Sequence, residues 1–303
     1  MQVLYAYFQS GNTDFKKGEK ELLVSIDKVY DLYLYYLSVI PEITRAAKKI
    51  LDEARLKKLP TKEDLQPNEK LLNNKVIQMI ENSPSLQSAC KASKINWNDQ
   101  SDLTKKLYQT IKSSEEFEKY MMNSVNSFAE DKEFVMNIFK KIITDFEPLS
   151  FFFEEDSIYW ADDFELADAM VQKTIKQITE KDESITLLPL FKDEEDDKQF
   201  AIELFKQTIF YENDFDPIIA EKTKNWEFDR IAMMDVLLMK MALAEVLSFP
   251  TIPVKVTLNE YIEISKSYST PKSKQFINGI LDKIIADYKK ENKIKKTGRG
   301  LLE

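Results

Sequence analysis

Residues 226–247 read WEFDRIAMMDVLLMKMALAEVL, and from Ile231 to Leu247 the only polar residues are Asp235, Lys240 and Glu245. At about 100° per helical residue, these three charges lie about 140° apart around the axis, so no wide polar face remains. The stretch is too polar and slightly too short to span a membrane. It therefore predicts a helix surrounded by protein on most sides, at the centre of an all-α core.

The ends of this helix are marked by Asp229 and Arg230 before it and by Pro250 and Pro253 after it. A core helix explains its apolar residues. Its three charges need a separate explanation, because an unpaired charge in apolar surroundings is costly. Each of them must reach solvent, a partner side chain or another molecule.

Glycine is scarce in this chain of 303 residues: there are five, and none lies between Gly18 and Gly279. This scarcity excludes phosphate-binding loops, dinucleotide-binding turns and most β-hairpins. Long runs rich in Lys, Glu, Leu and Ile remain, which are typical of helices. We expect an all-α helical bundle with additional helices.

Catalytic and metal-binding residue types are equally scarce. The chain has no histidine, so the commonest general base and metal ligand is missing. The single Cys90 excludes an internal disulfide and a multi-cysteine zinc site. The acidic run at 193–197 lacks calcium-loop spacing and reads as a solvated connector. We predict no enzyme activity, no cofactor and no metal site. Without a signal peptide or membrane span, we expect a cytoplasmic protein with no membrane partner.

Charge is distributed unevenly along the chain. The formal net charge of −9 argues against nucleic-acid binding by the whole surface. Residues 283–303, however, hold seven Lys/Arg against three Asp/Glu, whereas residues 180–197 hold eight acids against two lysines. A local basic site is therefore compatible with the composition.

A long helical pattern runs from Lys17 to Lys58 and contains Pro41. It carries tyrosines that could form a base-stacking platform or an amphipathic packing face, and their leucine neighbours favour packing: Tyr30, Tyr33, Tyr35 and Tyr36.

The sequence repeats itself weakly at an offset of 66 residues. KEFVMNIFKKII at 132–143 resembles KQFAIELFKQTI at 198–209, and the same offset aligns Trp160 with Trp226 and Asp163 with Asp229. This pattern suggests a helical unit that occurs twice.

The last third of the chain predicts a pair of helices. One follows the proline-rich turn at 249–253, and the next has Ser269 or Thr270 as its cap. Because Gly279 in the second helix costs roughly 1 kcal/mol against Ala, we expect a neighbouring helix to approach closely there. Two apolar rows predict its buried face: Phe276, Ile280, Ile284 and Tyr288, beside Ile277, Leu281 and Ile285.

These motifs resemble the NusB family. The series W…R…D…L…A…E that begins at Trp226, IPVKVTLNEYIEISK at 252–266 and FINGILDKI at 276–284 are similar to that family over about residues 226–285. MQVLYAYFQ at 1–9 resembles the family's first helix, and residues 131–225 match more loosely.

The resemblance also implies a domain organisation. Residues 1–12 and about 131–290 would form the NusB-like core, about 13–130 an extension, and 291–303 a basic C-terminal tail. The family typically has an arginine-rich segment before the first helix, whereas this chain begins at Met1 without one. We therefore expect weak RNA binding by the chain alone, with the tail either compensating or remaining a solvated end.

The function implied by the resemblance is transcription antitermination. NusB proteins pair with a small-subunit ribosomal protein, NusE, and bind the boxA segment of nascent RNA. The pair acts in the antitermination complex of RNA polymerase, chiefly on rRNA operons. Two alternatives stay open: a NusB-like helical domain of an RNA methyltransferase, and a helical adaptor that binds only a protein.

Six residues are assigned by the resemblance. Tyr5 and Phe276 match aromatic residues on the RNA-facing side, and Lys272 and Lys274 lie in the loop that approaches RNA. Phe276 also heads an apolar row, so it either stacks on a base or belongs to the core. Toward the ribosomal protein, the matching positions are acidic Asp235 and basic Lys240.

Overall fold

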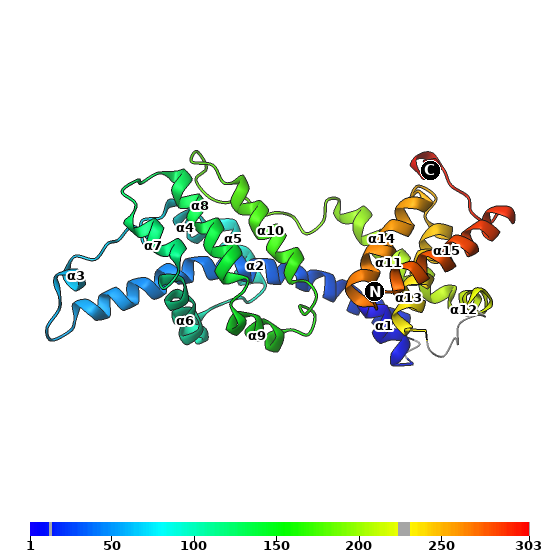
Figure 1. Ribbon diagram of the computed structural model, residues 1–303, viewed down its shortest axis with the longest axis horizontal. Coiled ribbons are helices and arrows are strands. Elements are labelled where there is room, and N and C mark those ends of the chain that lie inside the picture. The colour runs from blue at the N-terminus through cyan, green and yellow to red at the C-terminus, as the bar shows by residue number, and fades with distance from the viewer. Residues whose placement is uncertain (12–13, 224–230, 303) are drawn as a thin grey trace. The chain divides into compact units, whose positions relative to one another are not determined.

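The computed structural model describes residues 1–11, 14–223 and 231–302. Within these ranges the chain is helical and contains no β-strand, so the predicted all-α class is confirmed (Figure 1). None of the helices described is long and apolar enough to cross a membrane. The chain divides into two compact units, which we call unit 1 (Met1–Val24 and Phe191–Glu303) and unit 2 (Ser25–Leu190).

Unit 1 contains α1 (Gln2–Gln9), the start of α2 (Phe15–Arg55), α11 (Glu194–Phe210), α12 (Glu212–Lys222), α13 (Met233–Ser248), α14 (Val254–Tyr268), α15 (Ser273–Lys290) and a 3-10 turn (Gly298–Leu301). Unit 2 contains the rest of α2, α3 (Lys62–Leu65), α4 (Lys75–Glu81), α5 (Pro84–Ala92), a 3-10 turn (Asn98–Gln100), α6 (Ser101–Lys112), α7 (Glu115–Met122), α8 (Phe128–Ile138), a π-helical turn (Phe139–Ile143), α9 (Glu147–Asp156) and α10 (Phe164–Gln177).

Helix α13 is the central helix of unit 1. It packs against α1, α11, α12, α14 and α15 (Figure 1). Leu238 and Leu243 are fully buried, which confirms a helix surrounded by protein. Its predicted start at Asp229–Arg230 lies outside the described residues.

The charges of α13 are satisfied by other elements of unit 1. Glu245 is 6% exposed and accepts hydrogen bonds from the hydroxyls of Thr257 (2.7 Å) and Tyr261 (2.9 Å) on α14. Lys240, also 6% exposed, forms an ion pair with Asp216 of α12 at 2.8 Å. Partner side chains therefore compensate the burial of charge on this helix.

Helix α15 buries both of its predicted apolar rows, apart from the partly buried Phe276. The expectation of a close helix at Gly279 is wrong, because a Cβ built there meets no heavy atom within 4 Å. Close approach occurs instead at Gly18 of α2. A Cβ there would lie 2.8 Å from the ring of Phe205 and 2.9 Å from that of Tyr7.

Unit 2 is organised around α2, which continues through Pro41. Tyr33, Tyr35 and Tyr36 are buried in its core, so their predicted packing role is confirmed. Edge-to-face ring contacts join Tyr35 to Trp160 and to other aromatic side chains. The tyrosines therefore offer no exposed stacking platform.

The boundary between the units differs from the one predicted. Helices α8 to α10, which the sequence places with the NusB-like core, belong to unit 2. Hydrogen bonds tie them there: the hydroxyl of Tyr33 pairs with that of Thr174 at 2.7 Å, and the backbone N–H of Lys75 donates to Asp131 at 2.8 Å.

The two segments of the weak repeat are both helical. Phe139 is buried in the core of unit 2 and Phe205 in that of unit 1. The other two pairs involve Trp226 and Asp229, which lie outside the described residues, so the repeat stays a prediction.

Candidate nucleic-acid interface

The turn between α14 and α15 is held by a buried carboxylate. Asp235 of α13 is 5% exposed and accepts hydrogen bonds from the hydroxyls of Ser269 and Ser273, the latter at 2.7 Å. The backbone N–H of Thr270 in turn donates to Ser273 Oγ at 3.2 Å. Hydrogen bonds to a charged acceptor are stronger than those between neutral groups. Asp235 therefore positions the turn.

The two serines were missed as partners of Asp235. The sequence places Ser269 or Thr270 as the cap of α15, but that helix begins at Ser273, and its N-cap, Lys272, makes no side-chain capping bond. A signal was present, since an acid on an apolar helix needs donors and 269–273 is rich in hydroxyls. Only the folded chain shows that the two meet.

Two lysines project from this turn. Lys272 and Lys274 are both exposed. The pKa of nearby Glu263 lies below its usual value, mainly because Lys266 donates a hydrogen bond to it, with the positive charges of Lys266 and Lys274 contributing. The turn therefore presents two exposed cations on a chain with a negative net charge.

The two candidate aromatic residues differ in setting. Phe276 lies in the first turn of α15 and packs partly against the core of unit 1. Tyr5 lies on α1 and is 39% exposed. Phe276 and Lys274 both lie in the first turn of α15, directly after Lys272, whereas Tyr5 comes from α1. The packing of Phe276 against the core is confirmed in part, and its stacking on a base stays a prediction.

Lys240 also has internal partners. Besides Asp216, its ammonium lies 3.4 Å from Glu212 and 5.2 Å from the ring centre of Phe8. Both Lys240 and Asp235 thus have structural roles inside unit 1. That either side chain also meets a partner protein stays a prediction.

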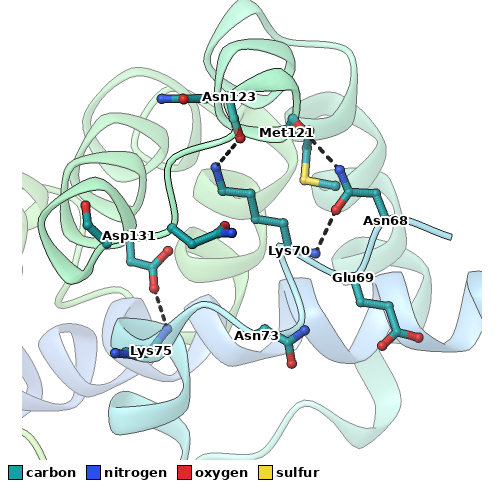
Figure 2. A pocket seen from close by; sticks show the side chains of 10 residues that line it. Asn68, Glu69, Lys70, Asn73, Lys75, Met121, Asn123 and Asp131 are labelled. Atoms are coloured by element: carbon teal, nitrogen blue, oxygen red, sulfur yellow. Dashed lines mark hydrogen bonds between the residues drawn. The ribbon is translucent and has the colours of Figure 1, made fainter.

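Unit 2 contains a polar pocket of about 480 Å³ between residues 68–75 and 121–131 (Figure 2). Lys70 crosses it and donates hydrogen bonds to the backbone oxygens of Asn123 (2.9 Å) and Val125 (2.8 Å) and to Glu130 (3.0 Å). The side chain of Lys70 is only 8% exposed, and its ammonium hydrogen-bonds within the protein, joining the two segments.

Reactive or metal-binding groups are not assembled in the part of the chain that the structure describes. No three His, Cys, Asp or Glu side chains are placed there to hold a metal ion. Burial raises the pKa of the Cys90 thiol to about 11, so little nucleophilic thiolate exists at neutral pH.

Comparisons with known proteins agree on one family. The model of the NusB family matches residues 164–286. Over 105 residues the chain is 44% identical to the transcription antitermination protein NusB of Salinibacter ruber, covering 35% of this chain and 66% of the relative. The NusB protein of Chloroherpeton thalassium is 42% identical over 106 residues (35% and 50%), and that of Dictyoglomus turgidum 38% over 96 residues (32% and 67%).

No solved structure matches the chain. The aligned part spans between half and two thirds of the length of these relatives and leaves most of unit 2 unmatched. It does include α11 to α14 and nearly all of α15, with the turn that Asp235 holds. On this similarity the chain belongs to the NusB family.

Proposed function

We propose that this protein binds single-stranded RNA through the α14–α15 turn and acts as a transcription antitermination factor. Its target would be boxA-containing nascent RNA, chiefly of rRNA operons, and its partner the small-subunit ribosomal protein NusE in the antitermination complex of RNA polymerase. The observation that carries the proposal is the pair of exposed lysines beside Phe276, on a turn inside the segment that matches the family.

The chemistry of the turn suits a single strand. Lysine ammonium groups neutralise phosphates, and an aromatic ring stacks on an unpaired base for about 1–3 kcal/mol. Tyr5 is exposed enough to offer a second ring. Asp235 holds this surface in place by accepting hydrogen bonds from the hydroxyls of Ser269 and Ser273. We infer a binding role rather than catalysis.

Titration of boxA-like RNA with and without NusE tests the proposal. We expect weak binding by the protein alone and tighter binding once NusE is present. Binding to NusE with no RNA affinity in either mixture would indicate a protein-binding adaptor instead. Absence of binding to both would overturn the proposal.

A double variant locates the RNA surface. Lys272→Gln with Lys274→Gln should flatten the dependence of log affinity on log salt by ~0.7 for each lysine that contacts a phosphate. Both lysines are exposed, so the free energy of unfolding should change by less than about 0.5 kcal/mol. The matched control is Lys105→Gln with Lys106→Gln on α6, which removes the same charge from an exposed surface of unit 2. If both double variants have equal salt slopes, RNA binds to a surface other than the α14–α15 turn.

A further inference from the structure

The basic segment after α15 folds back onto unit 1. The backbone N–H of Thr297 donates to the carbonyl of Pro250 at 2.9 Å, and the ammonium of Lys296 donates to that of Phe249 at 2.9 Å. Ile294 packs partly buried against the core of unit 1. We call residues 293–302 the strap. It is not the solvated end considered from sequence.

Gly300 makes this docking specific. A Cβ built on it would overlap the carbonyl oxygen of Pro250 and lie 3.0 Å from the carbonyl carbon of Pro250 and 3.2 Å from that of Thr251. Since these atoms belong to backbone, they cannot move aside as a flexible side chain could. Any larger residue at position 300 must displace the strap.

The docked strap presents unpaired cations. Lys295 and Arg299 are exposed and take part in no ion pair within the described residues. The ammonium of Lys296 faces inward instead, and burial lowers its pKa, an effect that the charge of Glu245 opposes. The strap therefore has one inward anchor, Lys296, and two outward cations, while its fourth cation, Lys293, pairs with Glu291 at 2.6 Å.

The strap and the α14–α15 turn lie at opposite ends of α15. The turn precedes Ser273, whereas the strap leaves the helix after Lys290. The 18 residues of α15 span roughly 27 Å at ~1.5 Å per residue. A base-stacked helical strand rises ~3.4 Å per nucleotide, so about eight stacked nucleotides cover this distance, and an unstacked single strand covers it with fewer.

We propose that the strap is an anchored phosphate-binding element that takes the same RNA strand as the α14–α15 turn. The inference rests on the proposed RNA binding, and the strap itself lies beyond residues 164–286 that match the family. Lys295 and Arg299 contact backbone phosphates without reading base identity. A strand engages both surfaces only when it is long enough to span α15.

Two kinds of variant test the strap in the full-length protein. Lys295→Gln with Arg299→Gln removes its outward charges, and Gly300→Ala displaces it without changing charge. Affinity is measured by fluorescence anisotropy across a salt series, with RNAs of about 3 and about 16 nucleotides, chosen to fall short of and to exceed the span of α15. For the longer RNA the charge variant should flatten the log–log salt slope by ~1.4, and Gly300→Ala should flatten it by a comparable amount. The shorter RNA should respond less to both.

Matched controls keep the outcomes distinct. Gly279→Ala also adds a methyl group to unit 1, but into open space. This variant should therefore bind RNA with the affinity of the unaltered protein. Lys105→Gln with Lys106→Gln controls for net charge. Circular dichroism verifies that each variant remains folded.

Three results would overturn the strap as an anchored element: a charge variant that matches its control, a Gly300→Ala protein that binds normally, or equal losses for both RNA lengths. If RNA binding still depends on Lys272 and Lys274 in those cases, the proposed function is retained and only the role of the strap is rejected. If the unaltered protein binds no RNA, both the proposed function and the proposed role of the strap are rejected.

Discussion

The α14–α15 turn of unit 1 and the polar pocket of unit 2 contain similar residues in opposite arrangements. Each is built on a buried aspartate: Asp235 is 5% exposed and Asp131 is 8% exposed. In the turn, hydroxyl groups satisfy the carboxylate, and the lysines point outward. In the pocket, the Lys70 ammonium points inward and donates hydrogen bonds to the backbone carbonyl of Asn123 (Figure 2) and to that of Val125.

This difference teaches what makes a lysine available to a partner. The side chain of Lys70 is 8% exposed, and a buried ammonium is costly unless it is paired, so two backbone carbonyls and Glu130 accept its hydrogen bonds. Where serine hydroxyls complete the local hydrogen bonds, Lys272 and Lys274 stay exposed. Substitutions of four charged groups test the comparison, from the largest expected effect to the smallest.

Lys70→Met should cost about 3 kcal/mol of unfolding free energy, because it leaves two carbonyls and Glu130 without their buried donor. Amide hydrogen exchange should increase in residues 68–75 and 121–131 of unit 2. RNA affinity should be unchanged. A loss below 1 kcal/mol would mean that water replaces the ammonium and that Lys70 is not needed to close the pocket.

Asp235→Ala should cost about 2 kcal/mol, since two hydroxyls lose a charged acceptor in a buried site. The turn should loosen, so RNA affinity should fall although Lys272 and Lys274 are intact. Asp235→Asn keeps one acceptor and should restore part of both properties. If Asp235→Asn instead weakens only NusE binding, with stability and RNA affinity unchanged, the carboxylate contacts the partner directly.

Lys240→Met should cost about 1–2 kcal/mol in urea unfolding. Its ammonium is buried, but Asp216 and Glu212 are 44% and 35% exposed, so solvent offsets part of the lost attraction. Combining it with Asp216→Asn in a double-mutant cycle isolates the pair. If the changes in unfolding free energy of the two single variants add up to that of the double variant, Lys240 contributes mainly by packing against Phe8.

The ion pair between Lys222 of α12 and Asp287 of α15 should have the smallest effect. The pKa of Asp287 lies below its ordinary value, mainly because Lys222 donates a hydrogen bond at 2.7 Å. A carboxylate with a lowered folded pKa adds stability above its unfolded pKa of about 3.9 and loses it as the pH falls through the folded pKa. NMR titration should show the pKa of Asp287 rising in Lys222→Gln. An unchanged pKa would exclude this pair as the cause.

Several features were predictable because they depend on local periodicity. The 17-residue apolar run that forms nearly all of α13, the packing of Tyr33 and Tyr36 and the two buried rows of α15 all follow from the spacing of apolar residues along a helix. The family resemblance rested on the same kind of information, since residues at fixed spacing on α14 and α15 carry it.

Other features could not be read from spacing. Gly279 suggested a close helix contact, yet Gly18 and Gly300 have the contacts that exclude a side chain. The boundary at Val24 and Phe191 likewise depends on which distant segments pack against one another. A glycine or a linker signals only that the backbone is permissive, not which atoms lie opposite.

The sequence by itself determined the all-α class and the buried course of α13, because helical periodicity is a property of neighbouring residues. Its motifs at 226–285 also carried the resemblance to the family. Only the tertiary structure decided which charges are available. Asp235, Lys240 and Lys296 face inward to partners from distant segments, whereas Lys272, Lys274, Lys295 and Arg299 remain exposed. The reason is physical: pairing requires atoms within about 3 Å, and chain folding alone brings residues far apart in sequence to that distance.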